Sequence, residues 1–166
     1  SELRLQLDKC TPKSLLVNAL SKIQVPERIS ILDHTADDLE MFLDTPTMEK
    51  VFASMIKNAI DATSEKGTIE IRSALIGPDV KITFIDSGTG IPENVLPKIF
   101  SPLITTKAKG MGMSLAICKR IIDAHGGKVM VESAVGKGTT FTITLPIRPK
   151  TEFTVKNSAL AFDLLE

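Results

Sequence analysis

The sequence has no excess of charge of either sign, since 20 Lys and Arg residues balance 20 Asp and Glu residues. Proteins whose main partner is nucleic acid usually show a basic excess, so this balance argues against such a partner. No apolar run is long enough to span a membrane, and no signal peptide is visible. A length of 166 residues with 43% apolar composition instead allows one globular domain with a sizeable core.

Cysteine is scarce, and its two positions exclude a disulfide framework. Cys10 and Cys118 also lack metal-ligand spacing to His34 or His125. Two buried apolar thiols in a reducing cytosol are the favoured interpretation, so we expect a cytoplasmic location. Because the chain begins at Ser1 without Met, we expect a fragment of a longer protein.

Hydrophobic periodicity predicts an α+β fold. Helical spacing predicts helices over residues 12–23, 45–63 and 113–124, with Thr45 as a cap and a short helical segment over 93–100. The strands predicted from apolar runs between turns are 28–32, 39–43, 68–75, 80–85, 128–132 and 139–145. We therefore expect a two-layer sandwich, with a mixed, mostly antiparallel sheet covered on one face by helices. The expected domain spans residues 1–149, and a tail over 150–166 packs on it or on a partner.

The motif Asp86-Ser87-Gly88-Thr89-Gly90-Ile91-Pro92 follows one of these strands. Its carboxylate can accept a hydrogen bond from a base edge, and glycines let a backbone approach a ligand closely. Asp-Ser-Gly is also common in turns, so this motif alone leaves a turn and a nucleotide site as equal alternatives.

Three further segments carry polar groups suited to a nucleotide. In the second long helix, Ser54, Asn58 and Asp61 point the same way beside the apolar face, and Asn58 could give an oxygen to Mg²⁺. The segment 105–115 combines lysines and glycines ahead of a helix, which suits a polyphosphate but is not a Walker A loop. In 136–141, Thr139 could place a hydroxyl beside Asp86. Taken alone, the helix stripe and the 136–141 segment are better explained as a solvated helix flank and a hairpin turn, and the 105–115 segment is a weak signal.

The order of these segments resembles the GHKL ATPase superfamily, and within it the catalytic and ATP-binding domain of two-component sensor histidine kinases. The matching boxes are Asn58–Ala62 (N box), Asp86–Gly90 (G1), Ile99–Lys107 (F), Gly110–Leu115 (G2) and Gly136–Phe141 (the final glycine-threonine box). The resemblance covers residues 12 to about 147. Five boxes in order are a far more specific signal than any one of them.

The resemblance implies binding of ATP with Mg²⁺ and transfer of the γ-phosphate to a histidine. Asp86 would hold the adenine amino group with support from Thr139, Gly88 and Gly90 would pack beside the base, and Asn58 would ligate Mg²⁺. Residues 101–112 would form a mobile lid over the phosphates. The full set of implied nucleotide-binding residues is Asn58, Asp61, Asp86, Gly88, Gly90, Ile91, Phe100, Thr106, Lys107, Lys109, Gly110, Met111, Gly112, Met113, Ser114, Leu115 and Thr139.

Three positions depart from the family pattern. Ser54 stands where kinases carry an Asn and gyrase-like hydrolases a general-base Glu, and a hydroxyl is too weakly basic to activate water. Asp61 would repel phosphate unless it acts through metal or water. Ser114 replaces a glycine at a helix start, where serine is easily accepted.

Neither histidine resembles a phosphoacceptor, because neither His34 nor His125 is followed by the expected acidic residue in a helical hairpin. The implied partners are therefore a separate dimerisation and phosphoacceptor hairpin of the same kinase and the receiver domain of a response regulator. Two alternatives remain at this point. One is a free-standing serine kinase of the anti-sigma-factor type, and the other is a non-catalytic nucleotide-switched interaction module.

Overall fold

The computed structural model describes residues 2–102, 113–150 and 154–156. The helices within these ranges are α1 (Pro12–Leu20), α2 (Thr45–Ala62) and α3 (Leu115–Ala124), with a 3₁₀ turn η1 (Leu96–Lys98). The strands are β1 (Glu2–Arg4), β2 (Asp8–Cys10), β3 (Ile29–His34), β4 (Met41–Leu43), β5 (Gly67–Ile76), β6 (Asp79–Asp86), β7 (Lys128–Ser133), β8 (Thr139–Pro146) and β9 (Thr154–Lys156).

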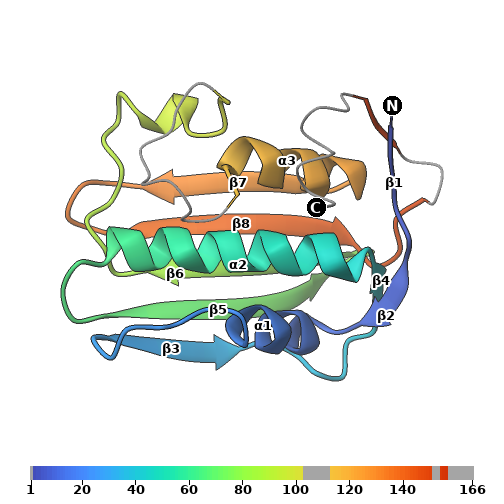
Figure 1. The fold of residues 1–166 in the computed structure, drawn as a ribbon, viewed down its shortest axis with the longest axis horizontal. Coiled ribbons are helices and arrows are strands. Elements are labelled where there is room, and N and C mark those ends of the chain that lie inside the picture. The colour runs from blue at the N-terminus through green and yellow to red at the C-terminus, as the bar shows by residue number, and fades with distance from the viewer. Residues whose placement is uncertain (1, 103–112, 151–153, 157–166) are drawn as a thin grey trace.

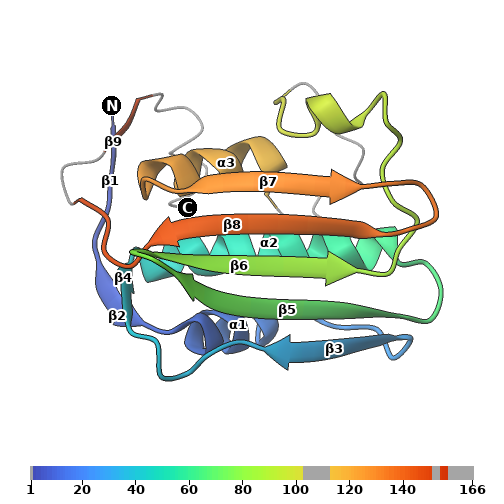
Figure 2. The same ribbon diagram turned by 180° about the vertical axis from the view of Figure 1, so that it is seen from behind.

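Five strands form one mixed sheet in the order β3-β5-β6-β8-β7, with β3 parallel to β5 and the other neighbours antiparallel. Helices α1, α2 and α3 all lie on one face of this sheet (Figure 1), and the view from behind shows the opposite face without a helix across it (Figure 2). This arrangement confirms the two-layer α+β prediction. Two small antiparallel pairs, β1 with β9 and β2 with β4, were not predicted.

The core lies between α2 and the centre of the sheet. Alternate residues of β6 face the helices, and its side chains Val80, Ile82 and Phe84 are at most 1% exposed. The Phe84 ring meets the Phe52 ring of α2 edge to face, with 5.2 Å between centroids. Burying each such side chain contributes about 1.5–3 kcal/mol. The same alternation directs the last residue of β6, Asp86, toward the helix layer.

The predicted helix boundaries need four corrections. Asp44 caps α2 instead of Thr45, because its extended backbone lets its carboxylate accept the N–H of Thr47 at 3.3 Å. Helix α1 ends at Leu20, where bonds spanning three residues tighten the chain over 21–23. Helix α3 begins two residues later than predicted, because Ser114 is its N-cap. The segment 93–100 is helical only over η1.

His125, the C-cap of α3, is hydrogen-bonded to Asp44, the N-cap of α2. Its side chain is 0% exposed. Its Nδ1 lies 2.8 Å from the carbonyl oxygen of Ile121, and its Nε2 accepts the N–H of Asp44 at 3.1 Å. A carbonyl only accepts, so the proton sits on Nδ1 and the ring is neutral. Burial lowers the pKa of His125 below its usual range.

The glycine C-cap predicted after α3 is confirmed. Gly126 has a φ of +72°, in the left-handed region that favours glycine. The N–H of Gly127 bonds to the carbonyl of Ile122 at 2.9 Å, and that of Gly126 to Asp123 at 2.9 Å. The two cysteines are also buried as predicted, and burial raises the pKa of Cys10 to about 11.

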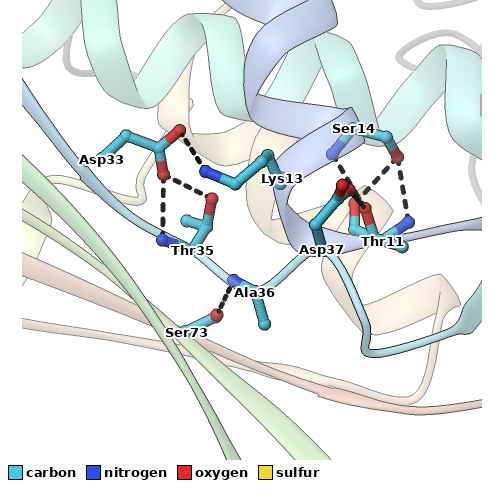
Figure 3. Close-up of polar contacts among 8 residues, drawn as sticks. All are labelled: Thr11, Lys13, Ser14, Asp33, Thr35, Ala36, Asp37 and Ser73. Carbon is cyan, nitrogen blue, oxygen red and sulfur yellow. Dashed lines mark hydrogen bonds and ion pairs between the residues drawn. The ribbon is translucent and has the colours of Figure 1, made fainter.

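Polar contacts fasten α1 to the β3 edge of the sheet (Figure 3). Lys13 donates to the carboxylate of Asp33 at 2.9 Å, and the N–H of Thr35 donates to the same carboxylate at 2.9 Å. The N–H of Ala36 donates to the hydroxyl of Ser73 on β5 at 2.8 Å.

In the described part of the chain, no helix is both long and apolar enough to cross a membrane.

Candidate nucleotide-binding site

Asp86 is a buried carboxylate at the end of β6, only 5% exposed. Its Oδ1 accepts the N–H of Gly88 at 2.9 Å, which folds the following residues into a tight turn. Burial raises the pKa of Asp86, while the backbone N–H groups of Gly88 and Thr139 act in the opposite direction. A carboxylate kept away from water with unused acceptor capacity is suited to a ligand that donates hydrogen bonds.

Thr139 lies directly opposite Asp86, as the first residue of β8. It is 4% exposed. Its hydroxyl lies 2.7 Å from the hydroxyl of Ser133, the last residue of β7. Because residues paired across antiparallel strands project to the same face, the Asp86 and Thr139 side chains both face the helix layer. The structure therefore places Thr139 beside Asp86, as the sequence predicted.

Ser133 was not among the residues predicted from sequence. Its hydroxyl accepts the N–H of Ile91 at 2.8 Å and lies 2.9 Å from the carbonyl oxygen of Gly138. It thus connects the loop after Asp86 to the turn before Thr139. The only sequence signal for it was its place at the end of a predicted hairpin strand, which puts it across from Thr139 in register.

Two glycines of the loop after Asp86 lie where its backbone passes close to the backbone of another segment. A Cβ on Gly88 would lie 2.2 Å from the carbonyl oxygen of Ala62, at the end of α2. A Cβ on Gly90, whose φ is +79°, would lie 2.1 Å from the carbonyl oxygen of Ala134. The N–H of Thr89 also bonds to Ala62 at 2.9 Å. These contacts show that the loop is held against α2, while packing of these glycines beside a base stays a prediction.

Asn58 carries an unpaired amide on the same end of α2, one turn before Ala62. Both its Oδ1 and its Nδ2 are buried and have no hydrogen-bond partner within the described residues. Leaving such groups unpaired costs about 1–3 kcal/mol each, which makes Asn58 a candidate for binding a ligand, an ion or a water molecule. Its Oδ1 is the type of oxygen that Mg²⁺ accepts as a ligand.

Ser54, one turn before Asn58, contacts the segment that leads into α3. Its hydroxyl accepts the N–H of Met113 at 3.1 Å and lies 3.4 Å from the Met113 carbonyl oxygen. At 2% exposure it is part of the core. The predicted stripe of Ser54, Asn58 and Asp61 therefore runs from the interior to the surface, since Asp61 is exposed. The hydroxyl links two helices and is not placed to activate water.

The start of α3 faces the same region. Ser114 caps the helix by accepting the N–H of Ile117 at 3.3 Å, and Met113 and Leu115 are half-buried. Phe100 packs edge to face on Phe141 of β8, with 6.3 Å between ring centroids. The remaining predicted residues, Thr106, Lys107, Lys109, Gly110, Met111 and Gly112, lie outside the described residues, as does most of the predicted lid.

Residues 43–149 match the family described as histidine kinase-, DNA gyrase B-, and HSP90-like ATPase. The chain belongs to this family. Membership of an ATPase family supports ATP as the substrate of the domain.

Several curated kinases are similar to the chain. It is 41% identical over 118 residues to the sensor histidine kinase ZraS of Escherichia coli. This match covers 70% of this chain and 25% of ZraS. It is 36% identical over 141 residues to sporulation kinase E of Bacillus subtilis, covering 82% of this chain and 18% of that kinase. The chain therefore spans about a quarter or less of the curated relatives that it matches.

Solved structures agree with this assignment. The catalytic domain of histidine kinase ThkA superposes with a TM-score of 0.77 at 31% identity, covering 89% of this chain and all of that domain. A longer form of ThkA in complex with the response regulator protein TrrA superposes with a TM-score of 0.73 at 30% identity, covering 89% of this chain and 43% of the longer one. The fold and the family membership thus rest on independent comparisons of sequence and structure.

Proposed function

We propose that this domain binds ATP between α2 and the Asp86 end of the sheet and transfers the γ-phosphate to a histidine on a separate helical hairpin of the same kinase. The proposal rests on one arrangement. A buried carboxylate on the sheet, Asp86, and a buried unpaired amide on the covering helix, Asn58, lie at the same end of the fold. The bond from Thr89 to Ala62 holds the two elements together there.

The described residues offer three kinds of group to a nucleotide. Asp86 and Thr139 offer hydrogen-bond acceptors to the amino group of the base. Asn58 offers its Oδ1 to Mg²⁺, which neutralises phosphate charge during phosphoryl transfer. Backbone N–H groups at the start of α3 suit a phosphate. Lys107 and Lys109 would add positive charge from the segment outside the described residues.

The absence of a general base at position 54 fits transfer to histidine better than hydrolysis. Water must lose a proton to become an effective nucleophile, and Ser54 cannot accept it. A neutral imidazole attacks with its own lone pair, so the new bond between nitrogen and phosphorus forms as the bond from the γ-phosphorus to the bridging oxygen breaks and ADP leaves. This chain supplies positioning and charge for that step, in keeping with phosphoryl transfer in general.

The partners follow from the same chemistry. The histidine would lie on a dimerisation and phosphoacceptor hairpin, because His125 is fully buried and both of its ring nitrogens are engaged. We further propose that the phosphoryl group then passes to the receiver domain of a response regulator on the cytoplasmic side. The complex of ThkA with its response regulator supports this part of the proposal.

The decisive experiment mixes this chain with the helical hairpin of its own full-length kinase and γ-labelled ATP with Mg²⁺. We expect acid-labile, base-stable label on the hairpin, and no label when the acceptor histidine is replaced by Gln. ATP binding without any transfer to the hairpin would contradict the kinase proposal and favour a nucleotide-switched interaction module. Absence of ATP binding would contradict the site itself.

A further inference from the structure

The hydroxyl of Ser133 stands at the centre of three polar contacts beside the predicted base site. It lies 2.8 Å from the N–H of Ile91, 2.9 Å from the carbonyl oxygen of Gly138 and 2.7 Å from the hydroxyl of Thr139. These distances alone leave the direction of the bond to Thr139 open, since either hydroxyl can donate. The other two partners decide it.

A serine hydroxyl has one hydrogen to donate and two lone pairs with which to accept. The Gly138 carbonyl can only accept, so the single hydrogen of Ser133 is committed to it. The Ile91 N–H can only donate, so it occupies one lone pair of Ser133. The contact with Thr139 therefore requires Thr139 to donate its hydrogen to the remaining lone pair.

This direction determines what the floor of the site offers to a ligand. With its hydrogen committed to Ser133, the Thr139 hydroxyl can only accept from a bound base. Asp86, directly opposite in the sheet, also only accepts when it is ionised, and its Oδ1 already holds the N–H of Gly88. Both side chains are at most 5% exposed, so an unmatched polar contact there is costly.

We propose that Ser133 is a specificity-determining residue: by holding the Thr139 hydrogen, it makes the floor of the site an acceptor-only surface that selects a 6-amino purine against a 6-oxo purine. The inference rests on the proposed function, because it assumes that Asp86 and Thr139 face the base. Ser133 acts through Thr139 and is a positioning residue. An amino group at position 6 donates to both acceptors, whereas a 6-oxo group would place a third acceptor against them and leave only the neighbouring N1–H to donate.

The test compares the affinities of ADP and inosine diphosphate for this chain by titration calorimetry with Mg²⁺. We expect the unmodified chain to prefer ADP by about 100-fold. In Ser133→Ala, the Thr139 hydroxyl is released and can turn its hydrogen toward a 6-oxo group. The preference should then fall to about 10-fold, chiefly because inosine diphosphate binds more tightly.

Three companion variants separate this effect from a loosened loop. Ser133→Thr keeps a hydroxyl and should restore the preference. In the double variant Ser133→Ala with Thr139→Val, no hydroxyl remains to donate, so the gain in inosine diphosphate affinity should disappear. Ser73→Ala is the matched control, because Ser73 also accepts a loop N–H at 2.8 Å but pairs with Ile82, four positions along β6 before Asp86.

Thr139→Val alone gives a second, isosteric test should Ser133→Ala fail to fold. If Thr139 only accepts, this change should weaken ADP by about 5-fold and leave inosine diphosphate unweakened. Equal weakening of both nucleotides would overturn the proposal, as would an unchanged preference in folded Ser133→Ala. An unmodified chain that binds no ADP would instead overturn the proposed function, and one that binds both nucleotides equally would overturn this inference alone.

Discussion

The two ends of α2 carry buried polar groups that differ in whether their bonds are complete. At the first end, Asp44 accepts from the N–H of Gln6 at 3.0 Å and from the Thr47 hydroxyl at 2.8 Å, and its own N–H donates to His125 at 3.1 Å. At the other end, both polar atoms of Asn58 are buried, and no described residue is their hydrogen-bond partner.

This difference separates groups that hold the fold from groups available to a ligand. The contacts at Asp44 and His125 consume the capacity of the groups involved, so removing one leaves a buried group unpaired. The groups at Asn58 and Asp86 have capacity left over, so removing one costs the fold little. Stability and ligand affinity should therefore respond in opposite ways at the two ends.

The largest effect is expected from His125→Ala. The change leaves a cavity and strands the buried N–H of Asp44, which should lower the free energy of unfolding by about 3 kcal/mol. Urea denaturation monitored by circular dichroism measures this loss. The folded fraction should still bind ADP with the original affinity. His34→Ala, at an exposed position, should change stability little, and an equal loss there would contradict the contrast.

Asp86→Asn should lower ADP affinity without lowering stability, which is the opposite of the effect expected from His125→Ala. An amide offers a donor where the base needs an acceptor, so ADP affinity should fall by about 2 kcal/mol, or roughly 30-fold. Stability should hold or rise, because a buried charge has been removed. Calorimetric titration and denaturation of the same sample measure both quantities. Asp79→Asn, at the other end of β6, is the matched control and should leave ADP affinity unchanged.

The pH dependence of stability should come from the His125 end. Because the pKa of His125 is lowered by burial, the unfolded chain binds more protons than the native one between that pKa and about 6.5. The contribution of His125 is therefore complete above a pH of about 6.5 and falls as the pH drops, by at most about 1.4 kcal/mol per unit, while the raised pKa of Asp86 acts in the opposite direction at lower pH. Denaturation curves at several pH values measure the slope. The slope of stability against pH should become smaller in His125→Gln and should be unchanged in His34→Gln.

Asn58→Leu is expected to have the smallest effect on stability, and a favourable one. Replacing an unpaired buried amide with an apolar side chain of similar size should raise the free energy of unfolding by about 1 kcal/mol. The same change should abolish the part of ADP affinity that depends on Mg²⁺, measured by titration with and without EDTA. Asn18→Leu removes an amide that is paired with Glu49 at 2.9 Å. A comparable gain in stability there would undermine the comparison.

Most elements of the fold were predictable because periodicity is a local property. The predicted segments 68–75, 80–85, 128–132 and 139–145 match β5, β6, β7 and β8 to within a residue or two, and α2 begins one residue before the start implied by the predicted cap at Thr45. The boundaries went wrong where a side chain outside the helix decides them, as at Asp44 and Ser114. The three short strands near the termini were missed, since β1 pairs with β9 from the opposite end of the chain.

In the candidate site, too, features set by local sequence were predictable and contacts between distant residues were not. Asp86, Thr139 and Asn58 stood out because they lie in motifs of local sequence, and the structure places Thr139 directly across from Asp86. The contacts of Ser133 with Ile91 and of Ser54 with Met113 were not visible, because each joins residues far apart in the sequence. Gly88 and Gly90 were singled out from the sequence as glycines in a motif. Their close approach to the backbone of Ala62 and Ala134 is visible only in the structure.

Local spacing in the sequence is sufficient to indicate the family, the order of most helices and strands, and most of the candidate polar residues. The hydrogen bonds that those polar groups already make follow from the packing of distant segments against one another. These bonds depend on contacts across the fold, such as Asp44 with His125 and Ile91 with Ser133. A hydrogen bond exists only when donor and acceptor meet within about 3 Å, and residue spacing does not encode such meetings between distant segments.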